Sequence, residues 1–125
     1  MSQEKTCLVV DDSSVVRKVL SKIITELGFK TSQAENGQAA LDACKASLPT
    51  VVLLDWNMPI MNGMQFFENF LEIPDHDETK VIFCTTENEL DKISEAIAKG
   101  ADEYIMKPFD KDILEEKFKQ VGLID

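Results

Sequence analysis

The stretch VVLLDWNMP, residues 51–59, decides how the rest of the chain is interpreted. Its four leading apolar residues are typical of a strand buried on both faces, as in the middle of a parallel sheet. The run then stops at a carboxylate, Asp55, and Pro59 prevents the strand from continuing. A buried strand that presents an acid at its tip needs a chemical reason for that acid.

Short apolar runs alternate with segments of helical periodicity along the chain. We expect strands at residues 6–10, 30–34, 51–54, 80–85 and 103–106. We expect helices that include residues 15–27, 39–44, 66–71, 93–97 and 110–121. This alternation predicts an α/β fold, a doubly wound five-stranded parallel sheet with five helices, in the strand order 2-1-3-4-5.

Length and charge limit the function classes. The 125 residues suffice for one core, and no linker divides them, so we expect a single domain over residues 1–125 without an output domain. The net charge of -10 argues against direct nucleic-acid binding, which needs a basic face. No run approaches the roughly 18 apolar residues of a membrane span, and the polar start MSQEKT does not resemble a signal peptide. These features predict a cytoplasmic protein without membrane contact.

Cysteine and histidine usage excludes other kinds of site. The three cysteines, Cys7, Cys44 and Cys84, form no C-x-x-C pair, so we expect buried, reduced thiols. His76 is the single histidine, and we expect it in a loop. A zinc site built from several histidines is therefore excluded.

Polar residues follow four of the five expected strands. Asp11 and Asp12 follow the first, Asp55 ends the third, Thr85 ends the fourth and Lys107 follows the fifth. In an open parallel sheet, ligands bind at the carboxyl ends of the strands, where the strand order reverses. We therefore expect three carboxylates, a hydroxyl and an ammonium to meet at one edge of the sheet.

Three adjacent carboxylates repel one another unless they hold protons or share a cation. Oxygen ligands without Cys or His favour a hard ion such as Mg²⁺. A divalent ion and Lys107 would neutralise the oxygens of a phosphoryl group, and a Thr hydroxyl would donate to one of them. Asp55 could then attack phosphorus and form an acyl phosphate, which explains an acid at the strand tip.

Four stretches resemble the receiver domain of two-component response regulators. They are VVDDSS at 9–14, LLDWNMPIMNG at 53–63, CTTE at 84–87 and YIMKPF at 104–109. The likeness covers essentially the whole chain, and each stretch lies at the end of an expected strand. The combination of DWNMP, KPF and a Tyr three residues before the Lys is most similar to stand-alone, chemotaxis-type (CheY-like) receivers. The resemblance implies a flavodoxin-like, CheY-like fold.

The resemblance also assigns the acids. Asp55 corresponds to the phosphoacceptor. Mg²⁺ is expected to bind the Asp55 and Asp12 carboxylates and the main-chain carbonyl of Asn57. Asp12 is expected to contact the ion directly and Asp11 mainly through water. From the residues alone, DDSS at 11–14 could instead simply cap the first helix, because Asp and Ser are good N-caps.

The remaining roles concern switching and access. The resemblance pairs Lys107 with the phosphoryl group, places Thr85 against it and makes Tyr104 an aromatic rotamer switch. It also implies a cis peptide between Lys107 and Pro108. The residues expected to tune access are Asn57, Thr86 and Glu87. Without the resemblance, Thr85 could be an ordinary strand-end hydroxyl, Lys107-Pro108 a turn, and Tyr104 a surface residue.

Three positions deserve separate expectations. Trp56 could belong to the core, but its place beside Asp55 favours a partly exposed ring at the site. Thr86 stands where family members often carry a small residue, and its β-branched side chain should narrow access to the phosphoryl group. Ser13 stands where chemotaxis receivers often carry an aromatic. The last two departures bear on the dephosphorylation rate and on the choice of partner.

These expectations describe a signalling switch. A histidine kinase would phosphorylate Asp55, and a monomeric protein, not an enzyme toward other substrates, would bind a target such as a flagellar motor switch. Alternatives within the class are a phosphorelay intermediate or a cell-cycle or stress regulator. A Mg²⁺-dependent aspartyl phosphatase would need an acid where Asn57 stands, and usually a cap domain. A flavodoxin-like cofactor carrier would need a phosphate loop where Asp11 and Asp12 stand.

Overall fold

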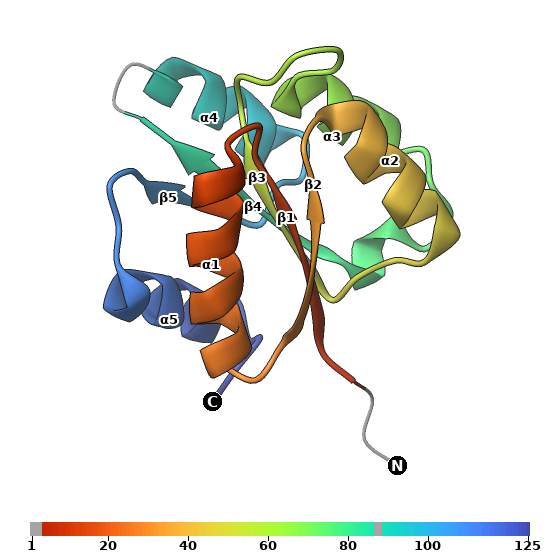
Figure 1. The fold of residues 1–125 in the computed structure, drawn as a ribbon. Helices are drawn as coiled ribbons and strands as arrows, with labels where there is room; N and C mark the ends of the chain where they lie inside the picture. The colour runs from red at the N-terminus through yellow and green to blue at the C-terminus, as the bar shows by residue number, and fades with distance from the viewer. Residues whose placement is uncertain (1–3, 87–88) are drawn as a thin grey trace.

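The computed structural model describes residues 4–86 and 89–125 and has the predicted α/β architecture (Figure 1). The strands are β1 (Thr6–Val10), β2 (Lys30–Ala34), β3 (Val51–Asp55), β4 (Lys80–Thr85) and β5 (Glu103–Met106). All neighbouring strands are parallel, in the order β2-β1-β3-β4-β5. The predicted order is therefore confirmed, and it reverses between β1 and β3, which places the carboxyl ends of these two strands side by side.

Helices connect the strands on both faces of the sheet. They are α1 (Ser14–Glu26), α2 (Gly37–Ala46), α3 (Gly63–Phe70), α4 (Leu90–Ala98) and α5 (Lys111–Gln120), and the short 3₁₀ turn η1 (His76–Glu78) precedes β4. His76 thus lies in a helical turn and not in an irregular loop. None of the helices in the described ranges is long and apolar enough to cross a membrane.

The helix ends follow from local chemistry. The Ser13 hydroxyl accepts a hydrogen bond from the Val16 N–H at 3.3 Å, so the capping interpretation of DDSS is correct for Ser13. Gly28, just after α1, has φ of +99°, a left-handed conformation that glycine adopts without the steric penalty of a Cβ. Both ends of α1, the helix that follows the acids, are therefore fixed by the sequence around it.

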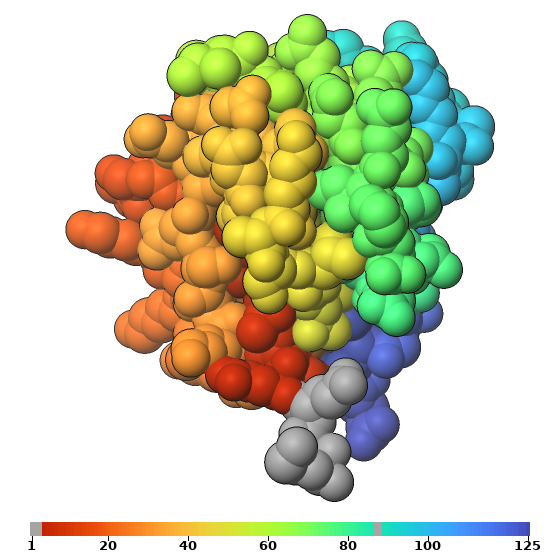
Figure 2. All heavy atoms as spheres, turned by 90° about the vertical axis from the view of Figure 1, so that its right-hand side faces the viewer, coloured from red at the N-terminus to blue at the C-terminus, as the bar shows by residue number. Residues whose placement is uncertain are grey.

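The sheet separates two apolar cores of different composition. Helices α2, α3 and α4 cover a face rich in aromatic rings, and α2 and α3 lie side by side on the surface in Figure 2. Its buried aromatic residues are Trp56, Phe66, Phe67, Phe70 and Phe83. Helices α1 and α5 cover a face whose strand residues are aliphatic or thiol: Cys7, Val9, Val51, Leu53, Ile82, Cys84 and Ile105. The three cysteines are free and buried, as predicted.

The apolar stripe of α1 is wider than the surface that the core covers. Leu20 and Ile24 are buried against the sheet, but Val15 and Val19 are 68% and 53% exposed. All four residues fall at the helical spacing that predicts α1, but this spacing alone does not say which of them the core covers. A helix that packs on one sheet buries only one stripe of its surface, and these two valines lie beside that stripe.

Candidate functional site

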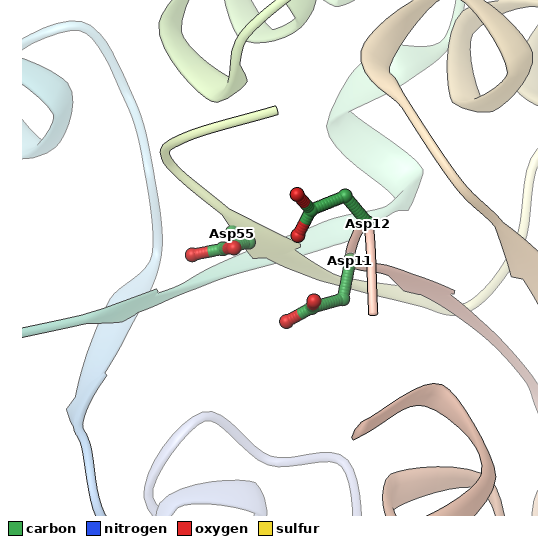
Figure 3. Close-up of side chains that lie close together, drawn as sticks. All are labelled: Asp11, Asp12 and Asp55. Atoms are coloured by element: carbon green, nitrogen blue, oxygen red, sulfur yellow. The ribbon is translucent and has the colours of Figure 1, made fainter. Parts of the chain in front are cut away.

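Neighbouring strands bring three carboxylates together at the carboxyl edge of the sheet. Asp11 and Asp12 follow β1, and Asp55 ends β3 (Figure 3). One oxygen of each lies within 4.8 Å of the other two. Oxygens that share one Mg²⁺ at about 2.1 Å lie roughly 3–4 Å apart, so a small contraction would let the cluster hold one ion. This oxygen-only donor set fits the Mg²⁺ site that the sequence predicts.

Asp55 is held by two donors on one oxygen. The Trp56 N–H donates to Asp55 Oδ1 at 2.9 Å, and Lys107 Nζ donates to the same oxygen at 3.0 Å. Within the described ranges, Oδ2 receives no hydrogen bond and so remains available to bind a cation or to attack an electrophile. Because Asp55 is only 9% exposed, the fold limits the directions from which a reactant can approach it.

Lys107 reaches the acids from the end of β5. Its backbone N–H donates to the Thr85 carbonyl at 2.6 Å, and its peptide bond to Pro108 is cis, as the resemblance implied. Its Nζ lies 3.8 Å from Asp11 Oδ2 as well as 3.0 Å from Asp55. Burial acts to lower the pKa of Lys107, but the hydrogen bond to Asp55 and the charges of Asp55 and Asp11 raise the pKa overall. Lys107 is therefore an ammonium at neutral pH.

Asp11 is anchored to the start of α1. Its Oδ1 accepts a hydrogen bond from the Ser13 N–H at 2.9 Å. Burial is the main cause that raises the pKa of Asp11; the Ser13 hydrogen bond and Lys107 act against this, while the charges of Asp55 and Asp12 add to it. Lys107 can neutralise one of the three carboxylates. The remaining negative charge favours a divalent cation, which would lower the energy of ionised Asp11.

Thr85 and Thr86 lie at the carboxyl end of β4, next to the end of β5 that carries Lys107. Thr85 ends β4 fully buried, and its hydroxyl donates to the Thr86 carbonyl at 3.2 Å. The Thr85 hydroxyl thus has a partner within its own loop in this structure and would have to leave it to bind a phosphoryl oxygen. Thr86 is half-buried and lines a groove together with Lys107, and its expected effect on access to the phosphoryl group stays a prediction.

Tyr104 lies outside the charged cluster but on the same face of the sheet as Thr85. In the β4–β5 register, Phe83 pairs with Tyr104 and Thr85 with Met106, and paired residues of parallel strands point to the same side. The Tyr104 ring is partly buried against the aromatic core, and Lys117 Nζ lies 5.3 Å from its centre. Tyr104 thus shares the Thr85 side of the sheet and lies beside α5, and its role as a rotamer switch stays a prediction.

The structure corrects the expectation for Trp56. Its ring is 2% exposed and stacks on Phe83, with 4.4 Å between the ring centres. It shares its side of the sheet with Val52 and Leu54, because the strand alternation continues one residue beyond Asp55. Trp56 is therefore a core residue whose backbone N–H, and not its ring, serves the site.

The loops beside the site contain one acid that the sequence analysis missed. Glu87, expected to tune access, lies outside the described residues. Glu89 is only 7% exposed, and it accepts hydrogen bonds from the Asn57 amide and from the Thr86 hydroxyl. The expected role of the Asn57 carbonyl in metal binding stays a prediction. The position of Glu89 directly before an amphipathic helix could have marked it as a candidate. An acid in that position, however, is equally typical of an ordinary helix start.

The comparison with known proteins agrees with this geometry. The family model described as "Response regulator receiver domain" matches residues 7–119. The chain belongs to the response regulator receiver domain family. Among relatives of this receiver, the chemotaxis protein CheY1 of Helicobacter pylori is 36% identical over 116 residues, which cover 91% of this chain and 94% of that protein. The chemotaxis protein CheY-3 of Vibrio cholerae is 32% identical over 122 residues, 97% of this chain and 94% of that protein.

Solved structures give the same result for the fold of the receiver. The chemotaxis response regulator CheY4 of Vibrio cholerae has a TM-score of 0.87 and 28% identity, covering 95% of this chain and 99% of that one. The receiver domain of NtrX from Brucella abortus has a TM-score of 0.83 and 27% identity, covering 92% and 96%. The family and the chemotaxis relatives support a phosphoryl-accepting switch of a two-component system.

Proposed function

We propose that this receiver takes a phosphoryl group from a histidine kinase onto Asp55, with Mg²⁺ bound at the acid cluster, and that it signals in chemotaxis. The observation that carries the proposal is the contact between Lys107 and Asp55 beside two further carboxylates. A buried carboxylate without a reaction partner would not need an ammonium and two further carboxylates beside it. An acceptor carboxylate needs both a cation and an ammonium, because three phosphoryl oxygens bring negative charge to an already acidic site.

The residues divide the work of phosphoryl transfer. Lys107 and the Trp56 N–H hold Asp55 Oδ1, so Oδ2 faces the donor. Oδ2 forms the new bond to phosphorus as the bond from phosphorus to the donor imidazole breaks, and the imidazole leaves with that electron pair. Mg²⁺, when bound by Asp12, Asp11 and Asp55, supplies charge neutralisation for the phosphoryl oxygens. Lys107 then turns from its carboxylate partner toward one of those oxygens.

The switch follows from the new charge. The Thr85 hydroxyl exchanges its bond to the Thr86 carbonyl for one to the phosphoryl group, and the space that it vacates lets Tyr104 turn inward. The surface of α4, β5 and α5 then changes its affinity for a target protein, with the flagellar motor switch as the first candidate. This is a two-state element biased by a local change in charge.

The donor protein needs a surface beside Asp55, and the groove between α1 and the end of β5 offers one. The groove has a volume of about 510 Å³ and is lined by Val15, Val19, Thr86, Lys107 and Phe109, among others. Exposed valines in the groove that Lys107 also lines suit an apolar helix of a phosphodonor. We assign the groove to the kinase, which leaves the surface of α4, β5 and α5 free for the target.

The proposal includes several consequences for the protein as a whole. The receiver acts in the cytoplasm as a monomer and catalyses only its own phosphorylation and dephosphorylation. A phosphorelay intermediate or a cell-cycle or stress regulator would use the same site with another target. Identification of the protein that binds only the beryllofluoride-activated receiver distinguishes these outputs.

Labelling with a small phosphodonor tests the core of the proposal. Acetyl phosphate and Mg²⁺ should add one hydroxylamine-sensitive phosphoryl group, detected by intact mass, and Asp55→Asn should abolish it. Asp42→Asn, at an exposed position on α2, is the matched control and should label normally. Labelling that survives Asp55→Asn would overturn the assignment. Val19→Glu should slow transfer from a kinase but leave labelling by acetyl phosphate unchanged.

A further inference from the structure

Glu89 links the two loops that frame the site. Its Oε1 accepts hydrogen bonds from the Thr86 hydroxyl at 3.1 Å and from the Thr86 N–H at 3.3 Å. Its Oε2 accepts one from the Asn57 amide, in the loop after β3. The Glu89 N–H in turn donates to the Thr86 carbonyl at 3.0 Å. The buried Glu89 carboxylate thus accepts from the N–H and the hydroxyl of Thr86, and the Glu89 backbone N–H binds the Thr86 carbonyl.

This arrangement reaches the switch residue through Thr86. The Thr86 carbonyl accepts the Thr85 hydroxyl as well as the Glu89 N–H. The position of that carbonyl therefore decides how well the Thr85 hydroxyl is held away from Asp55. Since the Glu89 carboxylate fixes the Thr86 N–H and hydroxyl, it also fixes the residue that supplies this carbonyl.

We infer that Glu89 is a positioning residue that latches Thr85 in its unphosphorylated arrangement, an inference that rests on the proposed function. When Thr85 moves to a phosphoryl oxygen, the Thr86 carbonyl loses one of its two donors and Thr86 can follow. The hydrogen bonds of Glu89 oppose that movement, so they stabilise the resting receiver against the activated one. Loss of Glu89 then shifts the equilibrium toward the activated arrangement.

Binding of beryllofluoride, a phosphoryl analogue, tests the latch. At a fixed Mg²⁺ concentration, amide NMR of the full chain gives the free and bound fractions directly. Glu89→Ala should bind beryllofluoride roughly threefold or more tightly than the unchanged protein, a ratio that corresponds to the net contribution of one or two hydrogen bonds. Glu95→Ala, which removes an exposed acid of α4 that pairs with Lys99, should leave the affinity unchanged.

A purely structural role for Glu89 predicts the opposite sign. It would lower thermal stability and weaken or leave unchanged the binding of beryllofluoride, and this result would overturn the latch. Thr86→Val keeps the β-branched shape but removes the hydroxyl that donates to Glu89, so it should tighten binding in the same direction by a smaller factor. If the unchanged protein itself fails to bind beryllofluoride, the proposed function fails; if it binds but neither variant tightens, only the latch fails.

Discussion

The interior of the sheet and its carboxyl edge are built from the same strands for opposite purposes. Along β3, Leu53 and Leu54 are buried in the two cores, and the next residue, Asp55, faces two other acids. Along β4, Phe83 stacks in the aromatic core, and two residues later Thr85 ends the strand with its carbonyl bound to the Lys107 N–H. The interior stabilises the fold through burial, whereas the edge keeps repelling charges close together at a cost in stability. The free energy gained by burial in the interior therefore offsets the destabilisation caused by the charges at the edge.

The largest effect should come from the interior. Phe83→Ala removes a ring that is fully buried and contacts both Trp56 and Phe67. We expect it to lower the free energy of unfolding by about 3–5 kcal/mol, because the ring's burial is lost and a cavity remains. Urea denaturation measures this, with Ile113→Ala on the exposed side of α5 as a control that should cost far less. A loss below about 1 kcal/mol would contradict the division between interior and edge.

At the edge, Lys107 should matter for ligand binding more than for folding. Lys107→Ala should weaken beryllofluoride binding by roughly tenfold or more, about 1.4 kcal/mol, because the ammonium at 3.0 Å from Asp55 is lost. Lys107→Arg should not restore it, since the planar guanidinium is bulkier than the ammonium that fits this contact. Titration followed by amide NMR compares the three proteins. Normal affinity in the Arg variant would show that any cation suffices.

Asp11 should make the edge sensitive to pH. Its pKa is raised in the folded protein above the ordinary value of 3.8, so the folded state holds this proton more tightly than the unfolded chain does. Stability is therefore highest below the unfolded pKa and falls as the pH rises through the raised pKa of the folded state. Asp11→Asn removes this fall and keeps an oxygen for the Ser13 N–H.

Urea denaturation between about pH 3 and pH 7, the range in which carboxyl groups titrate, compares Asp11→Asn with the unchanged protein in EDTA. The difference between the two should grow in favour of the Asn variant as the pH rises. Mg²⁺ should stabilise the unchanged protein at neutral pH more than the Asn variant, because the ion needs the carboxylate. Identical pH profiles for the two proteins would remove Asp11 as the source of the instability.

The same division explains what the sequence could predict. Strand and helix periodicity is a local property, and the five strands, their order and the cluster of Asp11, Asp12, Asp55 and Lys107 follow from it and from the resemblance. The errors occur where tertiary packing decides. Trp56 turned into the core because strand alternation continued past Asp55. Periodicity alone also does not reveal that Val19 is exposed, because it does not give the width of the stripe that α1 buries. Glu89 could not be predicted because its hydrogen bonds join loops that are distant in sequence.

The smallest effect should come from Thr86, which lines the same groove as Lys107. If Asp55 forms an acyl phosphate as proposed, water must attack it in line, opposite the Asp55 oxygen, and we expect the β-branched side chain to narrow that path. Thr86→Ala should therefore speed both phosphorylation by small donors and autodephosphorylation by roughly two- to tenfold, at most about 1.4 kcal/mol of barrier. The rates follow from acetyl phosphate labelling and from the decay of the phosphorylated protein after the donor is removed.

Thr86→Val separates this steric effect from a role of the hydroxyl in orienting the attacking water. The hydroxyl already donates its proton to Glu89, so it can serve a water only as an acceptor. If side-chain bulk limits the rate, Val should decay about as slowly as Thr, while Ala decays faster. If the hydroxyl orients the water, both variants should decay more slowly than the unchanged protein. Slower decay in both variants would refute the steric role. It would show that the Thr86 hydroxyl takes part in dephosphorylation, whereas the acids and Lys107 at the same edge act through their charges.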